Sequence, residues 1–140
     1  MNRAEFQRLA EVRLREAEAL LAAGFWDGAY YLAGYAVECG LKACILRRVG
    51  TDPSVIFVSR KFSDDCWTHD LTKLVKLAGL TSLLDAAIQA NSQLSAKWGL
   101  VVEWTEAARY EFHTAARSAA LFDAVTHPTS GVMPWIRTHW

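Results

Sequence analysis

The chain has 140 residues, of which 52% are hydrophobic, and its formal net charge is zero. This length fits a single domain, residues 1–140, with a core of its own. The lack of net charge argues against a general polyanion-binding protein and against a protein that lies on an acidic membrane surface. The sequence begins with no charged-then-apolar leader, so we expect a cytoplasmic protein.

The first predicted helix covers Asn2 to Ala23. Glu and Arg residues fill one side of it, and the other side carries Phe6, Leu9, Leu14, Ala17, Leu20 and Leu21. Gly24 is a suitable stop, and Asp27 is a suitable N-cap for the next helix. So short a connection predicts that the first two helices are antiparallel neighbours.

The segment from Gly28 to Ile45 is apolar around almost its whole circumference, which predicts a helix buried on all sides. Its length, roughly 27 Å, is close to what a membrane span needs. Glu38 and Lys42 interrupt it, however, and charge is costly in lipid, whereas Glu followed by Lys four residues later is a favourable helical pair. We therefore predict the central helix of a soluble bundle.

Two rows of side chains run along this central helix. The small row lets another backbone approach closely and consists of Ala29, Ala33, Ala36, Gly40 and Ala43. The polar row needs hydrogen-bond partners if it is buried and consists of Tyr31, Tyr35, Glu38 and Lys42. Either the polar row belongs to an ordinary core helix whose tips reach water, or it faces a functional cleft or a second subunit.

Further helices are predicted beyond the central one, which closes with Arg47, Arg48 and Gly50. Residues 51–67 form the least helical stretch and predict an ordered loop or a short extended segment. A helix is expected over 69–79, capped by Thr68, with one apolar face made of Leu71, Leu74, Val75 and Ala78. A second is expected over 82–91, and a helical turn or two within 92–104. The last long helix is expected over 106–126, capped by Thr105, with one face made of Tyr110, Ala116, Ala120, Leu121 and Ala124. A short amphipathic tail follows Pro128 and Gly131. The pattern predicts an all-α domain.

Three cysteines, Cys39, Cys44 and Cys66, are odd in number and lack zinc-ligand spacing. Two of them lie in the buried central helix, which is typical of reduced, packed thiols in a cytoplasm. We therefore expect no metal site. We also expect no cofactor, since the chain has no glycine-rich loop that could hold a phosphate.

Three blocks of sequence, taken in order, resemble the HEPN domain family: AYYLAGYAVECGLKACI, then THDLTKL after a variable loop, then EAARYEF. The resemblance runs from about Glu11 to Val125. The resemblance implies an up-and-down bundle of four to five helices that forms a homodimer. The tail of the chain adds a short C-terminal helix to this bundle. Some members are metal-independent ribonucleases, many in toxin–antitoxin or antiviral systems, and others pair with a small nucleotidyltransferase.

The family's ribonucleases carry an arginine, four to six intervening residues and a histidine at the start of a late helix. Here the nearest match is Arg109 to His113, with three residues between them, and Tyr110 replaces the polar residue expected after the arginine. On a continuous helix these side chains would share a face, where histidine could shuttle protons and arginine could stabilise phosphorane charge. A solvated face or a core contact also explains such a pair.

The remaining candidate binding residues are Tyr31, Tyr35, Glu38, Lys42, His69, Asp70 and Tyr110. His69 and Asp70 also have a structural explanation, since an aspartate in a first turn complements the helix dipole and the pair could bond the central helix. A basic patch of Arg47, Arg48, Arg60 and Lys61 could hold a phosphate or form a solvated edge.

The leading hypothesis is a homodimeric HEPN module that binds a nucleotide, an RNA or a partner protein, such as a nucleotidyltransferase, without strong catalysis of its own. The alternative is a divergent HEPN ribonuclease, a toxin or antiviral effector that uses Arg109 and His113. A third hypothesis is a purely structural helical dimer within a larger complex. None of the three involves a membrane.

Overall fold

The secondary structure of the protein is entirely helical. The computed structural model describes residues 1–140, of which 75% are helical, and contains no strand. The elements in chain order are α1 (Arg3–Ala22), α2 (Trp26–Thr51), the 3-10 helix η1 (Pro53–Phe57), α3 (Phe62–Asp65), α4 (Leu71–Leu77), α5 (Thr81–Ala90), α6 (Ser92–Val101), the 3-10 helix η2 (Glu106–Tyr110), α7 (Ala115–Thr126) and α8 (Val132–Arg137). The all-α prediction is confirmed, and α8 is a short C-terminal helix of six residues.

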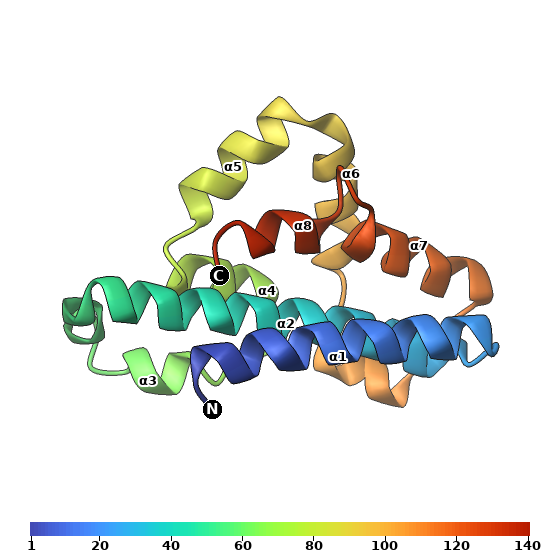
Figure 1. Cartoon of the computed structure of the whole chain (residues 1–140), viewed down its shortest axis with the longest axis horizontal. Helices are drawn as coiled ribbons and strands as arrows, with labels where there is room; N and C mark the ends of the chain where they lie inside the picture. The colour runs from blue at the N-terminus through green and yellow to red at the C-terminus, as the bar shows by residue number, and fades with distance from the viewer.

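Helices α1 and α2 lie side by side and run in opposite directions, as the short connection predicted (Figure 1). A capping box starts α1, in which Asn2 and Glu5 each accept the other's backbone N–H. Gly24 follows α1 at φ 83°, the left-handed conformation that a helix stop requires. The predicted Asp27 cap is wrong: α2 begins at Trp26 without any side-chain cap, and Asp27 lies in its first turn.

The central helix α2 is enclosed by α1, α4, α7 and α8, so almost every side of it is covered. This confirms the prediction of an all-round buried helix, and α2 is longer than predicted because it continues through Gly50 to Thr51. The alanines of the small row are all fully buried within the chain: Ala29, Ala33, Ala36 and Ala43. None of the helices has the length and hydrophobicity that crossing a bilayer would demand.

Short helical turns occupy residues 51–67, where the sequence left a loop or an extended segment open. Asp52 caps η1 by accepting the Ser54 N–H, and Pro53 takes the first position, where its missing N–H costs nothing. The four-residue helix α3 follows, with Phe62 buried. The extended alternative is therefore wrong, since local capping stabilises helical turns here.

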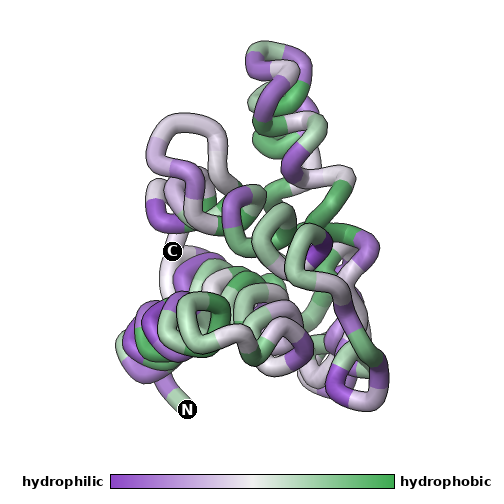
Figure 2. The backbone as a smooth tube through the Cα atoms, turned by 90° about the vertical axis from the view of Figure 1, so that its right-hand side faces the viewer, coloured by the Kyte–Doolittle hydropathy of each residue, from purple (hydrophilic) through white to green (hydrophobic).

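Helices α5 and α6 form an arm that stands away from the two long helices (Figures 1 and 2). Gly79, at φ 72°, ends the preceding helix and lets the chain turn into α5. Of the α5 side chains only that of Leu84 is buried, and α5 packs on α6. The arm carries both hydrophilic and hydrophobic residues (Figure 2), and its buried side chains Leu84, Leu94 and Val101 join it to the core.

The C-terminal third differs from its predicted pattern. The expected helix over 106–126 is divided into η2 and α7, and the buried face of α7 consists of Ser118, Leu121, Ala124 and Val125. Tyr110, Ala116 and Ala120, which were placed on the same face as Leu121, are exposed. The predicted buried face is wrong because it assumed one helix that begins at Thr105. A new helix, α7, begins after Thr114, whose side chain caps it, so different residues face the core.

We predict that Gly40→Leu lowers the free energy of unfolding by about 1–3 kcal/mol through overpacking. A Cβ atom at Gly40 would lie 3.0 Å from Cγ2 of Ile136 and 3.3 Å from Cε of Met133, so a branched side chain must displace α8. Gly50→Leu is the matched control in the same helix, since a Cβ there meets nothing within 4 Å. Urea denaturation of both variants tests this, and equal stability would mean that α8 yields easily.

Candidate functional site

A buried carboxylate, that of Glu38, lies at the centre of the molecule. Glu38 is 2% exposed, and its Oε1 accepts from Nζ of Lys42 at 2.8 Å. Both of its oxygens lie 3.0 Å from Nδ1 of His69. A buried charge is costly unless it is paired and hydrogen-bonded, and these two partners meet that requirement.

Local capping positions His69 over α2. Thr68 accepts the backbone N–H of Asp70, and Asp70 accepts the N–H of Lys73, so the turn before α4 is held by two side chains. Asp70, and not Thr68 as predicted, is therefore the N-cap of α4. Leu71 and Leu74 then anchor α4 in the core. The outcome is that His69 points to Glu38 while Asp70 stabilises the helix.

A polar cleft of about 420 Å³ opens beside His69. Residues 68–72 line one side of it, and the other side is lined by Val102, Trp104, Thr105 and Glu106. The His69 side chain is 46% exposed, and because a carboxylate accepts from Nδ1, the other ring nitrogen remains available to a ligand. The carboxylates of Asp70 and Glu106 add acceptors, so the cleft suits a ligand that carries hydrogen-bond donors.

The two predicted tyrosines of the polar row stack on one another and do not line this cleft. Their ring centroids are 6.0 Å apart, and Tyr31 also stacks on Trp104 at 6.0 Å. The guanidinium of Arg13 lies 6.0 Å from the Tyr35 ring. Burial raises the pKa of Tyr35, and the neighbouring Cys39 and Glu38 raise it further. Tyr35 therefore remains a neutral packing residue at physiological pH.

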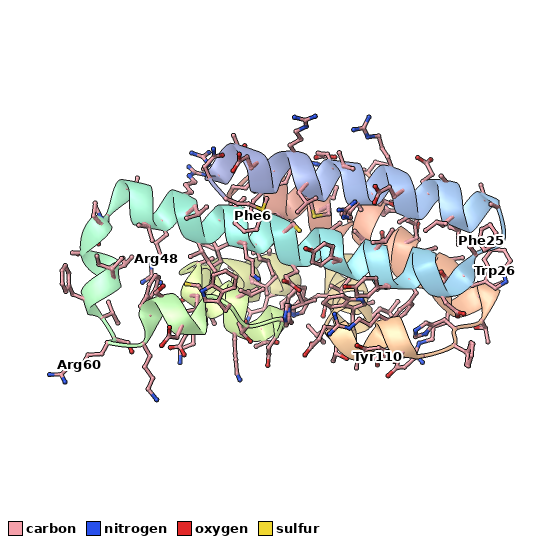
Figure 3. The ribbon with its side chains drawn as sticks, turned by 90° about the horizontal axis from the view of Figure 1, so that it is seen from below. Phe6, Phe25, Trp26, Arg48, Arg60 and Tyr110 are labelled. Atoms are coloured by element: carbon pink, nitrogen blue, oxygen red, sulfur yellow. The ribbon has the colours of Figure 1, made fainter.

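The structure does not place Arg109 and His113 on one helix face. Arg109 is exposed in η2, with its guanidinium 5.1 Å from the ring centroid of Tyr110, which is itself exposed (Figure 3). The chain becomes extended at Glu111, with φ −114° and ψ 156°, before α7 begins. The assumption of a continuous helix is therefore wrong, and the two side chains occupy different local structures.

His113 is packed in the protein interior. Its side chain is 1% exposed, and its ring stacks on that of Tyr30 with centroids 3.8 Å apart. Neither ring nitrogen has a hydrogen-bond partner, and the nearest carboxylate oxygen, of Glu111, is 3.7 Å from Nε2. Asp27 accepts the backbone N–H of His113, and this contact holds the extended segment against the start of α2.

Other predicted groups have structural roles. Arg47 and Arg48, the first half of the predicted basic patch, donate to the backbone carbonyls of Thr138 and Leu77. Burial raises the pKa of Cys39 and of Cys44 to about 12, so neither supplies a thiolate near neutral pH. No group of three or more His, Cys, Asp or Glu side chains is arranged to hold a metal ion.

The sequence reasoning missed Trp104, Thr105 and Glu106 as members of the cleft. Trp104 is 2% exposed, and its ring lies against Gly34, where a Cβ atom would come within 2.2 Å of it. The glycine inside a buried helix was the available signal, because such a residue marks close approach by another group. Nothing local connects these residues with His69, which is more than 30 residues earlier in the chain.

The fold and site define an all-helical domain in which a buried Glu–Lys–His centre joins the longest helix to a capped turn. The model of the HEPN domain family matches residues 4–111, most of the chain, and the chain belongs to this family. The matched range includes Glu38, Lys42, His69 and Arg109 but ends before His113. No curated protein and no solved structure gives a significant match.

We predict that Glu38→Gln lowers the free energy of unfolding by about 3 kcal/mol, because it leaves the ammonium of Lys42 largely buried without a counter-charge. The control is Glu16→Gln, which removes the partner of Arg13 at the surface and changes stability by at most about 1 kcal/mol. Urea denaturation measures both. A similar small loss in the two variants would show that Glu38 does not anchor the centre.

Proposed function

We propose that this protein is a homodimeric HEPN module that acts by binding and not by cleaving RNA. The ligand is a nucleotide or an RNA, held in the polar cleft beside His69, and a partner protein such as a nucleotidyltransferase is the other ligand class consistent with the family. The observation that carries the proposal is the burial of His113, which separates the only ribonuclease-like histidine from solvent, whereas Arg109 is exposed in η2.

A metal-independent ribonuclease needs an imidazole within about 3 Å of the ribose hydroxyl that it deprotonates. The His113 ring is stacked on Tyr30, and neither of its nitrogens is accessible to an RNA chain. Arg117 covers the same tyrosine, with its guanidinium 5.2 Å from the ring centroid. A toxin or antiviral ribonuclease that uses Arg109 and His113 is therefore the weaker alternative.

The cleft beside His69 supports binding of the ribose or the base of a nucleotide or an RNA, by its size and by its hydrogen-bonding groups. Its volume of about 420 Å³ lies in the range of small-molecule sites. Carboxylates such as that of Glu106 accept hydrogen bonds from ribose hydroxyls and base amino groups, and threonine hydroxyls both donate and accept. The free nitrogen of His69 adds a directional contact whose geometry is fixed by Glu38.

We expect overexpression to be non-toxic and purified protein to leave single-stranded RNA intact without added metal. The test compares wild type with His113→Ala on a mixed RNA substrate, with product lengths resolved on a gel. Cleavage by wild type that disappears in His113→Ala would overturn the binding proposal and establish the ribonuclease alternative.

Glu106→Gln should weaken the binding of AMP or a short single-stranded RNA by at least about tenfold, since a hydrogen bond to a charged group is worth about 1.5–3 kcal/mol. Glu103→Gln is the matched control, because Glu103 is exposed in the same segment but does not line the cleft. Calorimetric titration measures the affinities. No binding of either ligand by wild type would contradict the binding proposal, and equal weakening in both variants would place the ligand elsewhere.

A further inference from the structure

An apolar groove opens between α1, α2 and the segment that contains η1 and α3. Its volume is about 310 Å³, and nine of its eleven lining residues are hydrophobic. Phe6, which is labelled in Figure 3, lines the groove from α1, Ile45 and Val49 line it from α2, and Ile56 and Trp67 line it from the segment that follows. Small-molecule sites occupy about 300–1,000 Å³ and are mostly apolar with a few placed polar groups, so the groove has the size and the lining of such a site.

The groove combines a buried apolar wall with apolar side chains that the chain leaves uncovered. Ile45 is buried, whereas Trp67 is 78% exposed and Ile56 is 45% exposed. Large apolar side chains that gather at the surface often mark a ligand-binding groove. An apolar ligand would stabilise this arrangement, because its binding removes apolar area of both molecules from water.

A single charged side chain, that of Lys42, lines the groove. It is 14% exposed, and its ammonium donates to Oε1 of Glu38 at 2.8 Å. An ammonium carries three N–H groups, and Glu38 is the only acceptor that the chain gives it, so two N–H groups remain. The charge of Lys42 also acts on the groove wall: burial raises the pKa of the Cys66 thiol, as does Asp65, whereas Lys42 lowers it. The groove therefore offers hydrogen-bond donors within an apolar lining.

Glu38 decides which polar group a ligand of the groove needs. Its carboxylate already balances the charge of Lys42. A carboxylate on the ligand would lose its hydration in an apolar groove and would also be repelled by Glu38. A neutral carbonyl oxygen can accept from the remaining N–H groups of Lys42 without adding charge. A ligand that has only donors, such as an alkylammonium, would find no acceptor on Lys42 and would be repelled by it.

We propose that this groove binds a neutral small molecule with an apolar chain or ring and one carbonyl oxygen, which accepts from Nζ of Lys42. The site is separate from the polar cleft beside His69, since the two share no lining residue, and it does not depend on the nucleotide or RNA of the proposed function. Glu38 connects the two sites, because it accepts from Lys42 and also pairs with Nδ1 of His69. A ligand bound at Lys42 therefore changes the surroundings of the His69 ring.

The experiment titrates isotope-labelled wild-type protein with hexyl methyl ketone, heptanoate and heptylammonium, followed by NMR. The three probes share a hexyl chain and differ in the polar group. The ketone should shift the signals of the Trp67 indole and of the His69 ring, and it should bind at least about tenfold more tightly than heptylammonium and more tightly than heptanoate. No binding of the ketone, equal affinities for the three probes, or tighter binding of heptanoate would overturn the proposal.

A pair of variants locates the binding. Ser63 lines the groove and is exposed, so Ser63→Phe fills the groove without disturbing the core and should weaken binding of the ketone at least about tenfold. Ser82→Phe is the matched control, because Ser82 is likewise the exposed second residue of a short helix, α5, and does not line the groove. Circular dichroism checks that both variants are folded. Ketone binding that persists in folded Ser63→Phe, or that both variants weaken equally, would reject the groove as the site. The comparison of the three probes on wild type needs no variant, so it decides the proposal even where a variant does not fold.

Discussion

The charge of Glu38 inside a helix that is buried on all sides is the constraint on which the rest of the structure depends. A carboxylate that is 2% exposed must find partners, and its own helix provides only Lys42. The second partner, His69, comes from a turn 31 residues further along the chain. The turn must therefore lie against α2, which fixes the start of α4 and gives the polar cleft one of its walls.

Two glycines of α2 decide how closely its other neighbours approach. The indole of Trp104 occupies the space that a side chain at Gly34 would fill, and Met133 and Ile136 of α8 occupy the space beside Gly40. Because packed interiors tolerate little overlap, these glycines determine the positions of α8 and of the segment after α6. The second wall of the cleft, Trp104 to Glu106, thus depends on the absence of a side chain at Gly34.

Local patterns predicted the parts of the fold that local forces decide. Apolar periodicity located α1, α2, α4 and α5, and Gly24 and Gly79 marked helix ends because only their left-handed conformations allow the turn. The break between η2 and α7 was not predictable in this way. Thr105 and Thr114 are both plausible caps, and the contacts of the extended segment with Asp27 and Tyr30, more than 80 residues away, hold the break in place.

The two histidines named from the sequence show why residue type alone did not define the site. His113 stood at ribonuclease-like spacing, yet its ring lies in the interior with no hydrogen-bond partner. His69 resembled a helix-start residue, yet Glu38 orients one of its nitrogens while nearly half of its side chain faces solvent. A histidine can exchange protons with a ligand, or bind one, only where a ring nitrogen is accessible. Accessibility is a tertiary property, so neither the residue type nor the spacing of a histidine in the sequence predicts it.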